Sequence, residues 1–171
     1  MKLIRDSREG LPLHFEAVVG VEIVTEALST GDYSASYVIG GRVVESSSVI
    51  ERKEKGDLFS SYTSGYDRER KKFLRAIEAG KKFILAIEGT ASDILSGHTY
   101  IKGGIEHASK KDGMAMLRQL MSCSHKYGIQ LWFCSSRHEM SVMIQEYFLA
   151  EERMLKQHAE EHRENQKAHQ K

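Results

Sequence analysis

The sequence predicts a single α/β domain in which a mixed central β-sheet is flanked by helices on both faces. Short segments rich in β-branched residues alternate along the chain with segments in which apolar residues recur at helical spacing. Two segments, 82–88 and 129–135, are almost continuously apolar, which is typical of strands buried on both faces of a sheet. A length of 171 residues with 40% hydrophobic content is sufficient for one substantial core.

The first third of the chain is predicted to consist mainly of strands. Segments 22–28, 36–44 and 47–53 are short, rich in β-branched residues and interrupted by glycine. Turns are expected at 29–32 and at 40–41, where glycine and small polar residues gather.

Helices are predicted farther along. Apolar residues recur at helical spacing over 67–79, and Gly80 follows where a C-terminal cap is expected. A second helix is expected over 112–127, with Gly128 ending it before the apolar strand at 129–135. Its methionines are interpreted as core residues rather than as an adaptable binding surface.

A long helical pattern closes the chain and becomes polar on all sides beyond Met154. Such an end is typical of a frayed, solvated helix. We therefore expect the folded domain to span residues 1–150 and a polar, partly disordered helical tail to span 151–171.

Composition excludes several classes of protein. No apolar run approaches the roughly 18 residues of a membrane span, and Asp6 and Glu9 lie where a signal peptide would be apolar. The chain is therefore expected to be cytoplasmic. Cys123 and Cys134 lack CxxC spacing and are interpreted as reduced core thiols. Because the net charge is only +1, any nucleic-acid contact must come from a local basic surface.

The segment VIERKEKGDL, residues 49–58, is the most informative part of the sequence. In a strand, Glu51 and Lys53 point to one face and Arg52 points to the other, which places a carboxylate beside an ammonium. One explanation is an exposed edge strand protected by charge. Another is a catalytic site.

A catalytic site gains support from Asp32, which lies in a turn between two predicted strands. Asp32 and Glu51 together could bind one hard cation, and two acids with water suit Mg²⁺ better than zinc. Such a cation stabilises charge at a phosphorus centre. Lys53 would position the attacking water or neutralise the transition state.

These residues also resemble a known signature. Gly31-Asp32, then Glu51-Arg52-Lys53 and Asp57, is similar to the GDY…ERKxxxD motif of the XPF family of structure-specific DNA endonucleases, within the restriction-endonuclease-like superfamily. The opening IRDSREGLPLHF is similar to the DxRE segment of that family, in the form of its stand-alone bacterial and phage members. The order of the following helices and strands agrees over residues 3 to about 150.

The resemblance implies a Mg²⁺- or Mn²⁺-dependent endodeoxyribonuclease. Asp32 and Glu51 would be metal ligands, with the backbone carbonyl of Arg52 as a further ligand, and Lys53 would be the catalytic lysine. Asp6 would hold a metal-bound water or a second ion.

The remaining acid of the motif, Asp57, would support the site by anchoring the next helix or by orienting Arg52 through a salt bridge. An acid at a helix start is also favoured by capping and by the helix dipole alone, and this alternative has equal weight.

DNA contacts are expected from basic residues. Arg8 would pair with an active-site acid or reach a phosphate. The predicted helix after residue 67 would supply phosphate contacts through Arg68, Arg70, Lys71 and Lys72. Segment 96–113 is glycine-rich without firm periodicity and is expected to be a mobile loop that closes on DNA or a partner.

The expected substrate is branched or flap DNA, cut during recombination, repair or phage DNA processing in a bacterial or phage-infected cell. Family members usually continue into helix-hairpin-helix motifs, so a partner would target this form. A homodimer through the late helices is expected from exposed apolar residues at 143, 144, 147, 148 and 155, although packing within the chain would explain some of them.

Two alternatives stay open. One is a non-catalytic DNA-binding scaffold subunit with the same fold. The other is an unrelated α/β protein in which residues 49–53 form an edge strand and Asp32 lies far from Glu51.

Overall fold

A seven-stranded mixed sheet forms the centre of the computed structural model, which describes residues 1–168. Its strands lie in the order β2-β1-β3-β5-β6-β9, and β4 pairs with the free end of β3. The strands are β1 (Lys2–Asp6), β2 (Glu22–Glu26), β3 (Tyr33–Ile39), β4 (Arg42–Glu45), β5 (Ser48–Glu54), β6 (Lys82–Glu88) and β9 (Gln130–Cys134).

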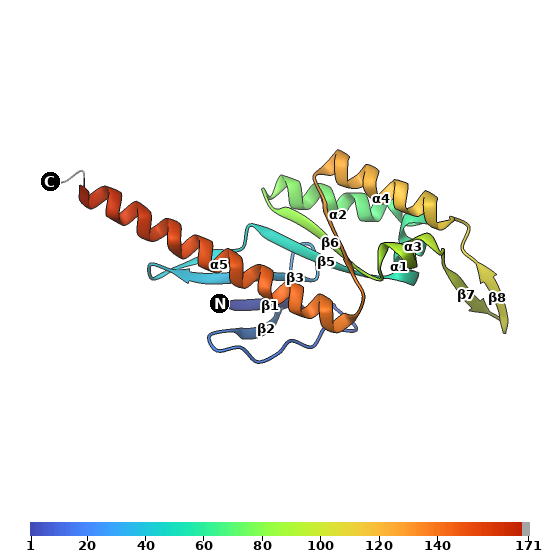
Figure 1. The fold of residues 1–171 in the computed structure, drawn as a ribbon, viewed down its shortest axis with the longest axis horizontal. Coiled ribbons are helices and arrows are strands. Elements are labelled where there is room, and N and C mark those ends of the chain that lie inside the picture. The colour runs from blue at the N-terminus through green and yellow to red at the C-terminus, as the bar shows by residue number, and fades with distance from the viewer. Residues whose placement is uncertain (169–171) are drawn as a thin grey trace.

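Helices cover both faces of this sheet (Figure 1). Helices α1, α2 and α4 pack on one face, and α5 packs on the other. The helices are α1 (Lys55–Thr63), α2 (Tyr66–Glu78), α3 (Ala91–Leu95), α4 (Gly113–Tyr127) and α5 (Arg137–Ala168). The predicted α/β class with a mixed, doubly covered sheet is confirmed.

The parallel strands β5, β6 and β9 explain the apolar runs in the sequence. Ile84 and Ala86 of β6 belong to the core beneath α5, whereas Leu85 and Ile87 belong to the core beneath α1, α2 and α4. All four side chains are fully buried. Apolar side chains are needed on both faces of a strand in this position.

Strand β5 lies between β3 and β6, so it is an interior strand. The explanation of its charges as protection of an exposed edge is therefore wrong. Glu51 and Lys53 are only 3% and 7% exposed, and charges are this deeply buried only when they are paired.

Segment 96–113 differs from its prediction as an unstructured loop. It contains an antiparallel hairpin of β7 (Thr99–Lys102) and β8 (Ile105–Ala108), which projects from the body beside α1 and α3 (Figure 1). Gly103 and Gly104 both have positive φ, as a two-residue hairpin turn requires. The described side chains of the two strands are exposed, so no alternation of apolar and polar residues signals a hairpin.

Helix α5 packs its apolar residues against its own sheet. Ile144 and Phe148 are fully buried, and Met143, Tyr147 and Leu155 are partly buried against the same core. The expectation that these side chains are exposed for dimerisation is therefore wrong, because β1, β3 and β6 present a complementary apolar face.

The predicted boundary at residue 150 falls inside α5, which continues without a break. Glu151 is 8% exposed and accepts hydrogen bonds from Tyr37 and Ser46 at 2.6 Å each and from the Ser47 amide at 3.0 Å. These bonds fix α5 to β3 and to the turn before β5. Residues 169–171 of the predicted tail lie outside the described residues.

Both cysteines are buried and free, as predicted for core thiols. Among the helices described, none has the length and apolar character needed to span a membrane.

Candidate active site

Three acids lie side by side across three neighbouring strands. The β1–β3 register pairs Arg5 with Tyr33, and the β3–β5 register pairs Tyr33 with Ile50. One step farther in each antiparallel pair lie Asp6, Asp32 and Glu51.

Backbone hydrogen bonds hold this row in place. The Asp6 amide donates to the Asp32 carbonyl at 2.8 Å, and the Asp32 amide donates to the Ile50 carbonyl at 2.8 Å. Asp6, Asp32 and Glu51 line one cavity of about 310 Å³. The acids predicted for one site are therefore brought together.

The ionised form of the Asp32 carboxyl is disfavoured in this row. Burial, and then the neighbouring charge of Glu51, raise the pKa of the Asp32 carboxyl to about 7. The Arg52 amide partly opposes this shift by donating to Asp32 Oδ2 at 2.8 Å. A half-buried Asp32 carboxylate and a buried Glu51 carboxylate that repel each other favour a bound cation.

Glu51 and Lys53 point to the same face of β5, as predicted from their spacing. Lys53 Nζ lies 3.6 Å from Glu51 Oε1 and donates to Glu69 Oε1 at 3.1 Å. Lys72 of α2 also donates to Glu51 Oε1. Glu51, Lys53, Glu69 and Lys72 thus form one buried charge network between β5 and α2.

Glu69 is a site residue that the sequence analysis missed. It is 0% exposed although it belongs to a strongly charged helix. In the sequence it is indistinguishable from the solvated acids of α2, since only the packing of α2 over β5 buries it.

Arg52 points to the opposite face, also as predicted. Its guanidinium pairs with Glu88 at 2.7 Å and with Glu9 at 3.3 Å, and Arg137 joins Glu88 at 2.8 Å. The expected salt bridge to Asp57 is therefore wrong.

Asp57 lies on the first turn of α1, which begins at Lys55, and its side chain is exposed. Among the predicted catalytic residues, the Asp57 side chain and the Arg52 guanidinium are not brought to the cavity. The position of Asp57 fits the alternative of a helix-start acid, since an acid there interacts favourably with the helix dipole.

Asp6 is engaged by Arg8, as expected for that arginine. The Arg8 guanidinium donates to Asp6 Oδ1 at 2.8 Å and to Oδ2 at 2.7 Å, while the Leu28 amide donates to Oδ2 at 2.8 Å. These hydrogen bonds, that of the Arg8 side chain first, lower the pKa of Asp6 to about 2. Both carboxylate oxygens of Asp6 thus hold the Arg8 side chain beside the cavity.

The basic residues of α2 divide into two sets. Arg68, Lys72 and Arg75 line the cavity, at the spacing of one helix face. Arg70 interacts with Tyr127 instead, and Lys71 is exposed outside the cavity. Arg75, whose side chain the sequence analysis did not select, could have been found from its spacing with Arg68.

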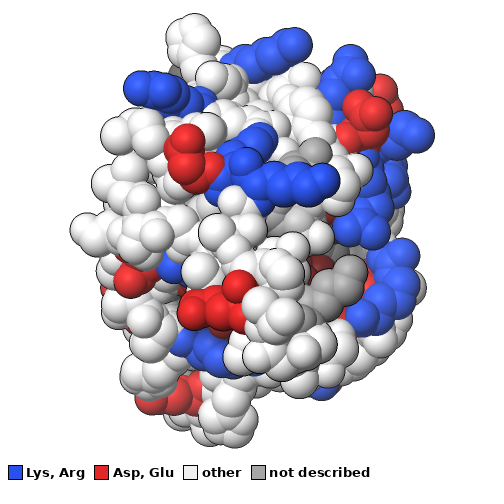
Figure 2. Space-filling view, turned by 90° about the vertical axis from the view of Figure 1, so that its right-hand side faces the viewer, with Lys and Arg blue, Asp and Glu red and all other residues white. Residues whose placement is uncertain are grey.

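Figure 2 shows the end of the molecule that bears the β7–β8 hairpin. Lys and Arg side chains gather along its right-hand flank, where they outnumber Asp and Glu. The overall charge of +1 therefore conceals a locally basic surface.

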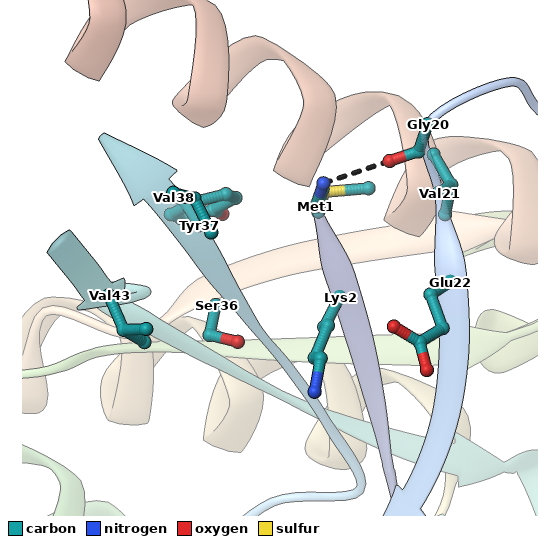
Figure 3. A pocket seen from close by; sticks show the side chains of 9 residues that line it. All are labelled: Met1, Lys2, Gly20, Val21, Glu22, Ser36, Tyr37, Val38 and Val43. Carbon is teal, nitrogen blue, oxygen red and sulfur yellow. Dashed lines mark hydrogen bonds between the residues drawn. The ribbon is translucent and has the colours of Figure 1, made fainter. Parts of the chain in front are cut away.

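A second hollow, of about 450 Å³, lies on the β1–β3–β4 part of the sheet (Figure 3). Val38 and Val43 border it, and the Met1 amino group donates to the Gly20 carbonyl at 2.8 Å. Lys2 and Glu22 are its charged side chains, and none of the predicted site residues lines it. Asp6, Asp32 and Glu51 line the smaller cavity instead.

The donor set of that smaller cavity fits a hard divalent cation with few protein ligands. Within residues 1–168, no three His, Cys, Asp or Glu side chains form a complete metal cage. Glu51 supplies a buried carboxylate and Asp32 a half-buried one, and Mg²⁺ commonly takes one or two carboxylates and keeps several waters.

Residues 5–147 match the family model described as the ERCC4 domain. The chain belongs to the ERCC4 domain family. None of the curated protein sequences is a match.

Solved structures support the fold of this ERCC4 domain. XPF from Aeropyrum pernix matches with a TM-score of 0.56 and 18% identity over 85% of this chain and 62% of that chain. XPF from Aeropyrum pernix in complex with DNA matches with the same values. The predicted XPF-type, restriction-endonuclease-like fold is confirmed, and this chain spans less than two thirds of the length of those XPF chains.

Proposed function

We propose that this ERCC4 domain is a Mg²⁺- or Mn²⁺-dependent endonuclease that hydrolyses phosphodiester bonds in branched or flap DNA. The observation that carries the proposal is the placement of Asp32, directly before β3, side by side with Glu51 of β5, with Lys53 beside Glu51. Family membership and the fold match to XPF support it.

Asp32 and Glu51 are the proposed metal ligands, with the Arg52 carbonyl beside them. When bound, the ion supplies Lewis-acid stabilisation of the charge that develops on the phosphate. Asp6 supports the site by holding Arg8, whose exposed side chain lines the cavity and is proposed to contact a DNA phosphate.

Lys53 is the proposed catalytic lysine. Its ammonium is held by Glu69 at 3.1 Å and by Glu51 at 3.6 Å, so its direction is fixed before DNA binds. A fixed cation at this place stabilises negative charge in the transition state without reorganisation.

Arg68 and Arg75 are the proposed phosphate contacts on α2, since both line the cavity. Contacts of this kind provide salt-sensitive affinity that does not depend on sequence. The proposal also includes a preference for branched DNA, a homodimer and a targeting partner. These parts rest on the family and not on particular described residues.

The test is cleavage of end-labelled duplex, splayed-arm, flap and four-way DNA with Mg²⁺ or Mn²⁺. Wild type is compared with Asp32→Asn and Glu51→Gln, and Glu78→Gln on the exposed part of α2 is the matched control. We expect wild type and the control to cut branched substrates, while both site variants bind DNA without cutting it.

Two results would contradict the proposal in different ways. Cleavage by both site variants at the wild-type rate would place the chemistry elsewhere. Binding without cleavage by wild type, with either ion, would favour the non-catalytic scaffold.

A further inference from the structure

Lys72 lies where a bound cation would be expected. Its ammonium donates to Glu51 Oε1 and lines the same cavity as Asp32 and Glu51. Lys72 was selected from the sequence as a phosphate contact, but its side chain is only 26% exposed and is turned toward the acids. In this arrangement it neutralises Glu51 rather than reaching DNA.

A second acceptor for this ammonium is already present. Glu69 Oε2 lies 3.7 Å from Lys72 Nζ, beyond hydrogen-bond distance. Among the described residues this buried oxygen has no hydrogen-bond partner. An unsatisfied buried carboxylate oxygen is costly, so a donor that moves toward it gains stability.

The remaining side chains restrict where Lys72 can go. Lys53 Nζ already occupies Glu69 Oε1 at 3.1 Å, which leaves Oε2 for a second ammonium. Glu69 is 0% exposed and lies three residues before Lys72 on α2, so the two side chains stay neighbours on one helix face. A short side-chain movement, without movement of the helix, is sufficient for the exchange.

We propose that Lys72 is an internal counter-cation of the two acids and that Glu69 receives its ammonium when a divalent ion binds Asp32 and Glu51. The inference rests on the proposed metal site. It makes Lys72 a competitor of the metal and Glu69 a positioning residue for Lys72.

Electrostatics gives the direction of the exchange. A divalent ion beside Glu51 repels a nearby ammonium, and Glu69 offers the nearest negative charge.

The experiment is calorimetric titration of Mn²⁺ into the full chain without DNA. Lys72→Met keeps the length and apolar stem of the side chain and removes its charge, and Lys71→Met removes the same charge from the exposed neighbour. We expect Lys72→Met to bind Mn²⁺ on the order of tenfold more tightly than wild type, the factor for removing one competing charge-assisted hydrogen bond. Lys71→Met should stay close to wild type.

A double-mutant cycle tests the role of Glu69. Glu69→Gln alone should weaken Mn²⁺ binding because Lys72 keeps its hold on Glu51. The loss should shrink in the Glu69→Gln, Lys72→Met double variant. A loss of equal size in both backgrounds would overturn the role of Glu69.

Thermal melts with and without Mn²⁺ give a second readout and show whether each variant folds. We expect Mn²⁺ to raise the Tm of Lys72→Met more than that of wild type.

The possible failures can be told apart. If wild type binds Mn²⁺ and Lys72→Met binds it no more tightly than Lys71→Met, the inference is wrong and the metal site stands. If neither wild type nor Lys72→Met binds Mn²⁺, both the metal site and the inference fail. Binding by Lys72→Met but not by wild type supports the inference.

Discussion

Asp32 and Glu51 face each other across the β3–β5 pair, one position beyond Tyr33 and Ile50 in the antiparallel register. Their side chains share a cavity, and their mutual repulsion adds to the effect of burial on Asp32. A site that holds two like charges in this way gives up stability of the empty protein for function.

The Asp32 carboxyl therefore gives a pH-dependent prediction. Its pKa in the folded, metal-free protein is raised to about 7, above its value of about 3.9 in an unfolded chain. The protonated Asp32 carboxyl therefore contributes stability that is fully present below pH 4. This contribution is lost as the pH rises through 7 and the carboxyl ionises. We expect Asp32→Asn in EDTA to be more stable than wild type by on the order of 2 kcal/mol at pH 8 and by little at pH 4.

Urea denaturation at both pH values measures this difference. Asp57→Asn, which changes an exposed carboxylate, is the matched control and should lack the pH-dependent gain. An Asp32→Asn variant that is less stable than wild type at pH 8 would contradict the electrostatic explanation.

Removal of the Lys53 ammonium should affect cleavage more than DNA binding. Lys53→Met fits the buried stem but leaves Glu69 without its 3.1 Å partner. We expect a loss of roughly 10²- to 10³-fold in the single-turnover cleavage rate, the size usual for one fixed electrostatic group.

Lys55→Met is the control for that experiment, since Lys55 lies two residues farther on and donates to the exposed Ser96 hydroxyl at 3.2 Å. DNA affinity, measured by fluorescence anisotropy, should change little in both variants. Equal cleavage rates for Lys53→Met and wild type would remove Lys53 from the mechanism.

The two sets of basic residues on α2 should differ in their contribution to DNA binding. Arg68→Gln and Arg75→Gln change side chains that line the cavity, whereas Arg70→Gln changes one that interacts with Tyr127. We expect each of the first two to weaken binding and to reduce the salt slope by about one, and Arg70→Gln to do neither. Titrations at several salt concentrations measure both effects, and equal effects of all three variants would mean that the cavity does not direct the DNA.

Glu151 should stabilise the fold in a second pH-dependent way. Burial raises the pKa of its carboxyl, but hydrogen bonds from Ser46, Ser47 and Tyr37 outweigh burial and lower it. A lowered pKa contributes stability that is present above the unfolded value of about 4.3 and is lost as the pH falls below it.

We expect Glu151→Gln to cost on the order of 1 to 3 kcal/mol at pH 7, the range for disturbing a buried hydrogen-bond acceptor. The difference from wild type should narrow at pH 3.5. Glu146→Gln is the control on the same helix, where Glu146 is exposed and lies 3.9 Å from Arg153. A constant difference at both pH values would assign the loss to packing instead of charge.

Most of the fold could be predicted because its signals are local. Strand β6, buried on both faces, is visible as an apolar run, whereas the apolar run of β9 forms a half-buried edge strand instead of the predicted buried one. The ends of α2 and α4 are visible in Gly80 and Gly128, both with positive φ. The β7–β8 hairpin escaped prediction because its exposed strands carry no alternating pattern. The face of α5 was assigned to a partner because an apolar stripe does not reveal which surface covers it.

The sequence by itself determined the class of fold, the family, and the spacing that puts Glu51 and Lys53 on one face with Arg52 on the other. These three features depend on the periodicity of a strand and on short motifs, and both are properties of residues close together in the sequence. Only the tertiary structure decided that Asp32 meets Glu51, that Lys72 pairs with an acid instead of reaching outward, and that Glu69 is buried. Pairing of charges depends on which elements pack together, and residues 16 to 21 positions apart in the chain become partners only when β3, β5 and α2 are assembled.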